Sequence, residues 1–130
     1  MGRSTSVRTS QVGLASATSA NGTARNGTAL PLELVAAGSL SVACVATIVT
    51  TSVVATFKPQ VSNDNTNWYD VRLSNSAALV TVTASASLAL QMADLSGWKF
   101  FRMVATLSGA TTAAGDLTQV DYVARKFGSA

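Results

Sequence analysis

The most informative property of this 130-residue sequence is what it has little of. It contains no histidine, one cysteine and two prolines, and charged residues make up only 12% of the chain. Without histidine, neither a Ser-His-Asp or Cys-His catalytic arrangement nor a histidine metal site can form. A single cysteine allows no internal disulfide, no cysteine zinc site and no iron–sulfur cluster. The charged fraction is about half the usual share for a soluble domain, which indicates that another molecule covers part of the surface.

The few charges lean positive, with nine Lys/Arg against six Asp/Glu and a net charge of +3. The basic residues are scattered and form no run of four or more, so the sequence does not indicate a nucleic-acid-binding patch. No apolar segment follows Arg3 and Arg8, as it would in a signal peptide. The most apolar run, residues 40–57, includes six Ser or Thr and is too polar for a membrane helix. We therefore expect no direct contact with nucleic acid or with a membrane.

What the sequence does have is 22 Ala, 16 Ser, 16 Thr and 15 Val. Val and Thr favour strands, and several segments alternate apolar and polar residues with a period of two. Turn-forming residues separate these segments at intervals of about 8–12 residues, which is typical of a sandwich or barrel. The chain length fits one domain. The sequence therefore predicts an all-β fold, an antiparallel β-sandwich (jelly-roll or Ig-like) of about seven or eight short strands over residues 31–130.

Residues 1–30 differ from the rest, because they contain no aromatic residue and few large aliphatic ones. The tetrapeptide Asn-Gly-Thr-Ala occurs at 21–24 and again at 26–29, and Asn-Gly is a turn-forming pair. Such a segment cannot bury enough apolar surface to order itself alone. We expect an extended N-terminal arm over residues 1–30 that another chain holds in place.

A loop at residues 62–67, Ser-Asn-Asp-Asn-Thr-Asn, joins two β-rich segments and predicts a hairpin. Asp64, with Asn63, Asn65 and Asp70, could instead hold a hard cation such as Ca²⁺ through oxygen atoms. The spacing lacks the pattern of an EF-hand loop, so a turn built by Asn and Asp side chains is the favoured interpretation. Pro59 precedes this loop and cannot donate to a ladder, which predicts an edge or a bulge there.

Five aromatic residues form the second candidate site: Trp68, Tyr69, Trp98, Phe100 and Phe101. Tryptophan and tyrosine on a β-sandwich could form a platform on which sugars stack. Alternation along a strand places Trp68 and Tyr69 on opposite faces, and likewise Phe100 and Phe101. We expect one residue of each pair in the core, and favour a core role for the aromatic residues over sugar stacking.

The sequence offers little for catalysis. The six carboxylates show no converging pair of the kind that a glycosidase needs. The glycines fit neither dinucleotide-binding nor P-loop spacing. Cys44 lies among apolar neighbours and is expected to be a small buried residue without reactivity. The sequence therefore predicts a protein that is not an enzyme and that needs neither a metal nor another cofactor.

Two segments carry a resemblance to a known kind of protein. Residues 56–71 read Thr-Phe-Lys-Pro-Gln-Val-Ser-Asn-Asp-Asn-Thr-Asn-Trp-Tyr-Asp-Val, and residues 98–104 read Trp-Lys-Phe-Phe-Arg-Met-Val. An apolar strand followed by Gln-Val-Ser-Asn-Asp, a turn and Trp, with an aromatic–Arg strand later, resembles small bacteriophage virion proteins of β-sandwich fold. Asn65 stands where glycine is more usual in the turn. Such modules occur as capsid decoration or cement proteins and as tail, fibre and neck parts.

The resemblance implies a structural virion protein of the decoration or cement type, made in the bacterial host cytoplasm and located on the capsid exterior. It would bind the major capsid protein of a phage shell, bridge neighbouring subunits and stabilise the shell, as a dimer or trimer. An arm that orders on binding and exposed strand edges suit such a role. The residues predicted to contact the partner are Arg3, Arg8, Arg25, Pro59, Asn63, Asp64 and Asn65.

Two alternatives stay open. A major shell or tail-tube subunit would assemble with itself when expressed alone. A tail or fibre glycan-binding module would bind sugars through Trp68 and Trp98.

Overall fold

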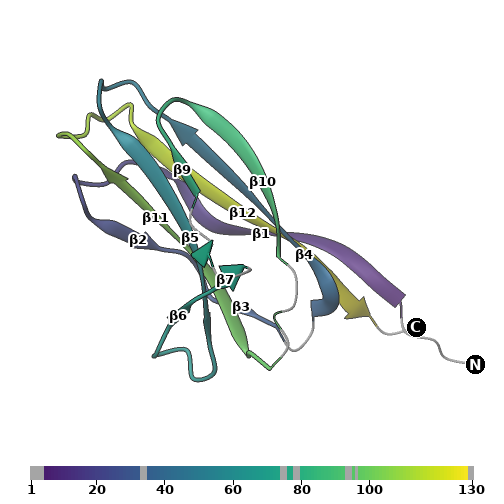
Figure 1. Ribbon diagram of the computed structural model, residues 1–130. Coiled ribbons are helices and arrows are strands. Elements are labelled where there is room, and N and C mark those ends of the chain that lie inside the picture. The colour runs from purple at the N-terminus through teal and green to yellow at the C-terminus, as the bar shows by residue number, and fades with distance from the viewer. Residues whose placement is uncertain are drawn as a thin grey trace, which may run out of the picture.

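The structure is a computed structural model that describes residues 5–32, 35–73, 76–77, 80–92, 95 and 97–128. These residues form strands and turns, and none of them lies in a helix, so no helix in this part of the chain could cross a membrane. Ten strands make two antiparallel sheets, and β7 (Arg72–Leu73) pairs with β8 (Ser76–Ala77) beside them (Figure 1). The predicted all-β, sandwich-like fold is confirmed.

Sheet A has the strand order β1-β12-β4-β10. Its strands are β1 (Thr5–Ala17), β12 (Leu117–Gly128), β4 (Val35–Thr47) and β10 (Ala86–Met92). Alternate residues of β4 and β12 are buried, as the period-two pattern predicts. They are Leu40, Val42, Cys44, Ala46, Thr118, Val120, Tyr122 and Ala124.

Sheet B has the order β2-β11-β5-β6, with β3 also paired to β11 and β9 to β5. Its strands are β2 (Ala24–Asn26), β11 (Phe100–Ser108), β5 (Val54–Ser62), β6 (Tyr69–Asp70), β3 (Leu30–Pro31) and β9 (Val80–Val82). Phe101 is fully buried and Phe100 is not, so one residue of this pair is in the core, as predicted.

Pro59 occupies an interruption in the pairing of β5. Next to β9 the ladder ends at Phe57, and next to β6 it begins at Gln60. The missing N–H of Pro59 therefore costs no ladder bond, although β5 lies inside sheet B rather than at its edge. The proline carbonyl accepts a hydrogen bond from Val71 N at 3.0 Å. The Pro59 side chain is buried, so it does not offer the partner contact that the sequence suggested.

Tyr122 of β12 connects the two sheets. Its hydroxyl accepts a hydrogen bond from Met103 N of β11 at 3.0 Å and donates one to the Thr28 carbonyl at 2.8 Å. Its ring lies 5.6 Å from that of Phe101 in an edge-to-face arrangement, a favoured geometry for aromatic pairs. One side chain therefore joins sheet A, sheet B and the N-terminal segment.

The segment predicted to be an arm is, from Thr5 onward, part of the two sheets of its own chain. Residues 5–31 contribute β1, β2 and β3, which pair with β12 and β11 of the same chain. Two glycines admit the Tyr122 ring: a Cβ at Gly13 would lie 2.6 Å from its Cζ, and one at Gly27 2.6 Å from its hydroxyl oxygen. Backbone pairing and close fit thus order a segment that lacks large apolar side chains.

Sheet A is longer than the rest of the sandwich. β10 ends where Met92 pairs with Leu40, whereas β1 and β12 continue until Thr5 pairs with Gly128. Figure 1 shows these ends of β1, β12 and β4 extending past the other strands. A narrow end of sheet A therefore projects from the body.

Candidate binding surfaces

The residues predicted to bind a partner do not gather at one place. Arg3 lies outside the described residues. Arg8 is in the projecting end of β1, directly opposite Arg125 of β12. Asn63, Asp64 and Asn65 are exposed in the loop after β5, which Figure 1 shows at another end of the molecule.

Arg25 is used within the chain. Its guanidinium donates to the carbonyl oxygens of Ala15 at 2.7 Å, Ala17 at 3.2 Å and Thr118 at 2.9 Å, and to the Thr118 hydroxyl at 2.9 Å. The β1–β12 pairing shifts register between Leu14 and Ala17, and this bulge turns carbonyl groups away from the ladder. Arg25 satisfies these carbonyls, so its role here is structural.

The loop at residues 62–67 is a turn held together by Asp64. The Asp64 carboxylate accepts bonds from Asn67 N at 2.8 Å, Thr66 N at 2.9 Å, the Asn67 side-chain amide at 2.7 Å and the Ser62 hydroxyl at 3.0 Å. Donation by the Asn67 and Thr66 backbone holds the Asp64 pKa well below its usual range. Asn65 has φ of 57°, a left-handed conformation that asparagine tolerates better than most residues, in the place where glycine is more usual.

Acidic side chains do not gather at this loop in the part of the chain that the structure describes. The described residues contain no group of three or more His, Cys, Asp or Glu that could hold a metal ion. Both oxygens of the Asp64 carboxylate already accept hydrogen bonds from the turn. The turn interpretation is therefore the one that the geometry supports.

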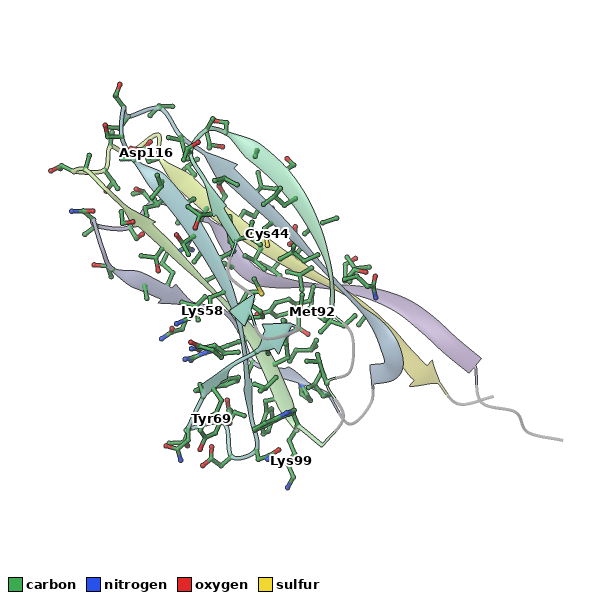
Figure 2. The ribbon with its side chains drawn as sticks, in the orientation of Figure 1. Cys44, Lys58, Tyr69, Met92, Lys99 and Asp116 are labelled. Carbon is green, nitrogen blue, oxygen red and sulfur yellow. The ribbon has the colours of Figure 1, made fainter. Side chains whose placement is uncertain are left out.

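The turn also approaches β11. Lys99 N donates to the Ser62 carbonyl and to Asn63 Oδ1, both at 3.1 Å. Figure 2 shows Lys99 and Tyr69 at the same end of the molecule, far from Asp116. The loop and the start of β11 thus lie together at one end of the sandwich.

Two tryptophans and a tyrosine lie at this end, outside the fully buried core. Tyr69 is 56% exposed, and its ring centroid is 5.7 Å from that of Trp98. Trp98 is half-buried and packs against the core, whereas Trp68 is half-buried without being part of it. The expectation that either Trp68 or Tyr69 would be a core residue is therefore wrong. The reason is that β6 has only two residues and lies at the edge of sheet B, where neither of its sides is fully covered.

A row of polar side chains runs beside Trp68. Arg102, Gln60 and Asp70 are register partners on β11, β5 and β6, so they share the outer face of sheet B. Arg102 Nε donates to Gln60 Oε1 at 2.9 Å, and Gln60 Nε2 donates to Asp70 Oδ1 at 2.9 Å. Lys58 Nζ lies 3.3 Å from Asp70 Oδ1.

The Arg102 guanidinium lies 4.3 Å from the centre of the Trp68 ring, within the range of a cation–π contact. Partial burial lowers the Arg102 pKa from its ordinary value, but arginine stays charged near neutral pH. We call Trp68, Tyr69, Trp98, Arg102, Gln60, Asp70 and Lys58 the β6 cluster. The sequence singled out the aromatic residues of this cluster but not Arg102, Gln60 and Lys58. The signal that could have found them is alternation, which places all three at outward-facing positions of the neighbouring strands β5 and β11.

Sheet A has an outer face of a different character. Register places Val12, Asp121, Ala43 and Ala89 in one row across its four strands. The adjoining positions are small or neutral, and none is aromatic. They are Ser10, Val123, Ser41 and Gln91 on one side, and Gln119, Val45 and Ser87 on the other. Asp121 is thus the single charged residue among these eleven positions.

Two further residues that could take part in a reaction, Asp116 and Cys44, have structural roles. Asp116 is buried and accepts bonds from Val49 N at 2.7 Å, Ala113 N at 2.8 Å, Thr50 N at 3.0 Å and the Thr50 hydroxyl. The Thr50 hydroxyl and these N–H groups hold the Asp116 pKa well below its usual range. Cys44 is buried in the core, as expected, and burial raises its pKa to about 12, which suppresses the reactive thiolate.

Comparison of the chain with protein-family models, with curated proteins and with solved structures finds no match.

Proposed function

We propose that this chain is a structural protein of a bacteriophage particle, a capsid decoration protein that binds the outside of the shell and bridges neighbouring capsid subunits. The observation that carries the proposal is the outer face of sheet A, where eleven positions include one charge, Asp121. The centres of protein–protein interfaces are likewise poor in charged residues. The resemblance of residues 56–71 and 98–104 to phage virion proteins supports the same role.

The projecting end of sheet A adds a second contact. There β1 is an edge strand, and it offers unpaired backbone groups to a neighbouring subunit. Binding that favours the assembled shell stabilises it by mass action, without catalysis. A dimer or trimer of the chain would connect several capsid subunits at once.

Rebinding to stripped particles tests the proposal. Particles purified from the encoding phage should contain the chain, and stripped particles should regain both the chain and their heat resistance when it is added back. Ala89→Lys places a charge on the sheet A face and should abolish rebinding. Thr81→Lys on β9, an exposed position of sheet B, is the matched control and should rebind normally.

Three outcomes would overturn the proposal. They are particles that lack the chain, stripped particles that are no less stable, and rebinding of Ala89→Lys as strong as that of Thr81→Lys. Ordered assembly of the chain by itself would favour the shell or tube subunit instead.

A further inference from the structure

The β6 cluster lies on the opposite sheet from the face used above, and the proposed capsid role leaves it unexplained. It contains three of the four Trp and Tyr residues of the chain. The fourth, Tyr122, is in the core. Trp98 packs partly against the core, but buried packing does not account for Trp68 and Tyr69. Large rings kept at a surface are typical of binding sites, because they contribute contact area with little loss of conformational entropy.

We propose that the β6 cluster is a saccharide-binding site, with the aromatic rings stacking on sugar rings and the polar row holding their hydroxyl groups. The Trp68 ring contacts Arg102 on one side and does not pack into the core. Tyr69 follows it in the chain and is the most exposed ring of the cluster. Trp68 directly precedes edge strand β6 and Tyr69 is the first residue of that strand, so two adjacent rings lie at an edge of sheet B that a ligand can reach.

The polar groups favour a sugar over a nucleic acid. A hydroxyl group both donates and accepts hydrogen bonds, and the row supplies both kinds of partner. Arg102 and Lys58 donate, Asp70 accepts, and Gln60 does both. A phosphate backbone needs donors only, and the Asp70 carboxylate offers it none. Asp70 therefore argues against single-stranded nucleic acid, which would otherwise suit cations beside aromatic rings.

The network also orients the site before a ligand arrives. Gln60 is held between Arg102 and Asp70, and Asp70 is held by Lys58, so these side chains need little further ordering. Preorganisation reduces the entropic cost of binding. The Lys99 backbone bonds to Ser62 and Asn63 fix the neighbouring loop in the same way.

Both tryptophans of the chain belong to the cluster, so intrinsic fluorescence reports binding directly. The experiment screens the full chain on a glycan array and then titrates it with cellohexaose, maltohexaose, chitohexaose and any array hit. We expect at least one saccharide to change the tryptophan emission in a saturable manner. Oligo-dT serves as the nucleic-acid arm and should not compete.

Tyr69→Ala should weaken that saccharide about tenfold, the loss expected for one stacked ring. Trp68→Phe should shift affinity less than Trp68→Ala, because a ring remains. Val49→Ala, which removes an exposed apolar side chain away from the cluster, should bind normally. Far-ultraviolet circular dichroism checks that each variant is folded.

No saturable change with any saccharide on the array or in titration would overturn the inference. So would equal affinities of Tyr69→Ala, Val49→Ala and the unmodified chain. Tighter binding of oligo-dT than of every saccharide would assign the cluster to nucleic acid. These results are independent of particle rebinding, because Ala89→Lys leaves the cluster intact.

Discussion

Replacing Tyr122 by phenylalanine tests how much the junction between the two sheets contributes to stability. The Tyr122 hydroxyl accepts from Met103 N at 3.0 Å and donates to the Thr28 carbonyl at 2.8 Å. Met103 is fully buried, so in Tyr122→Phe its N–H loses its partner inside the sandwich. A buried donor left without a partner costs about 1–3 kcal/mol, and the lost bond to Thr28 adds to this.

We therefore expect Tyr122→Phe to lower the free energy of unfolding by about 2–3 kcal/mol. Denaturant unfolding followed by tryptophan fluorescence measures this loss as a lower midpoint at unchanged slope. Tyr69→Phe is the matched control, since it removes the same atom from a side chain that is 56% exposed. Its effect should stay within about 0.5 kcal/mol. Equal, small effects of the two substitutions would refute the assignment of Tyr122 as the junction.

Four other changes test the same fold. Gly27→Ala should destabilise the chain by about 1–3 kcal/mol in denaturant unfolding, because a Cβ there would lie 2.5 Å from a backbone carbonyl oxygen; an unchanged midpoint would contradict this. Arg25→Lys should lower the melting temperature, because one ammonium cannot reproduce the four bonds of the guanidinium, and equal melting would show that charge alone suffices. The Thr50 hydroxyl and backbone N–H groups hold the Asp116 pKa low, so its contribution is present above about pH 4 and is lost as pH falls further. Melting temperature should therefore fall more steeply on acidification for the unmodified chain than for Asp116→Asn. Burial raises the Cys44 pKa from 9.0 to about 12, so the contribution of the Cys44 thiol to stability is present below pH 9 and is lost as pH rises toward 12. Cys44→Ala should therefore reduce the fall in melting temperature between pH 9 and pH 12. Parallel curves of melting temperature against pH for the two chains would contradict this cause.

Period-two alternation predicted the core of the central strands well. In β4 the alternate residues Leu40, Val42 and Cys44 are buried, and in β11 Phe101 is buried while Phe100 is not. The reason is physical, because a strand between two neighbours in a two-layer fold must turn one side toward the other layer. Pattern alone is sufficient wherever a strand is long and both of its edges are paired.

The N-terminal segment could not be predicted in this way. Its order does not come from its own apolar side chains but from distant partners that no local pattern reveals. Gly13 and Gly27 leave room for a tyrosine about a hundred residues later in the chain, and Arg25 reaches carbonyls of β1 and β12. Low hydrophobicity predicts an arm that another chain holds in place, whereas here the small residues allow backbone segments of the same chain to approach closely.

The candidate site was predicted in part. The sequence pointed to Trp68, Tyr69 and Trp98 but favoured a core role, on the assumption that most aromatic residues of a small sandwich are needed inside. An edge strand breaks that assumption, because β6 is only two residues long and leaves neither Trp68 nor Tyr69 fully buried. The polar partners became visible only through register, which places Arg102 and Gln60 side by side from strands far apart in sequence.

The few charged residues are also distributed unevenly over the two sheets, which composition could not show. If charges were merely rare, both outer faces would be diluted alike. Instead the outer row of sheet B brings Lys58, Asp70 and Arg102 together, while the eleven outer positions of sheet A named above carry Asp121 alone. A neutral face costs solubility unless something covers it, whereas a charged and aromatic face is stable in water and selective toward ligands. The two faces are therefore suited to different contacts, and Ala89→Lys and Tyr69→Ala should affect those contacts separately.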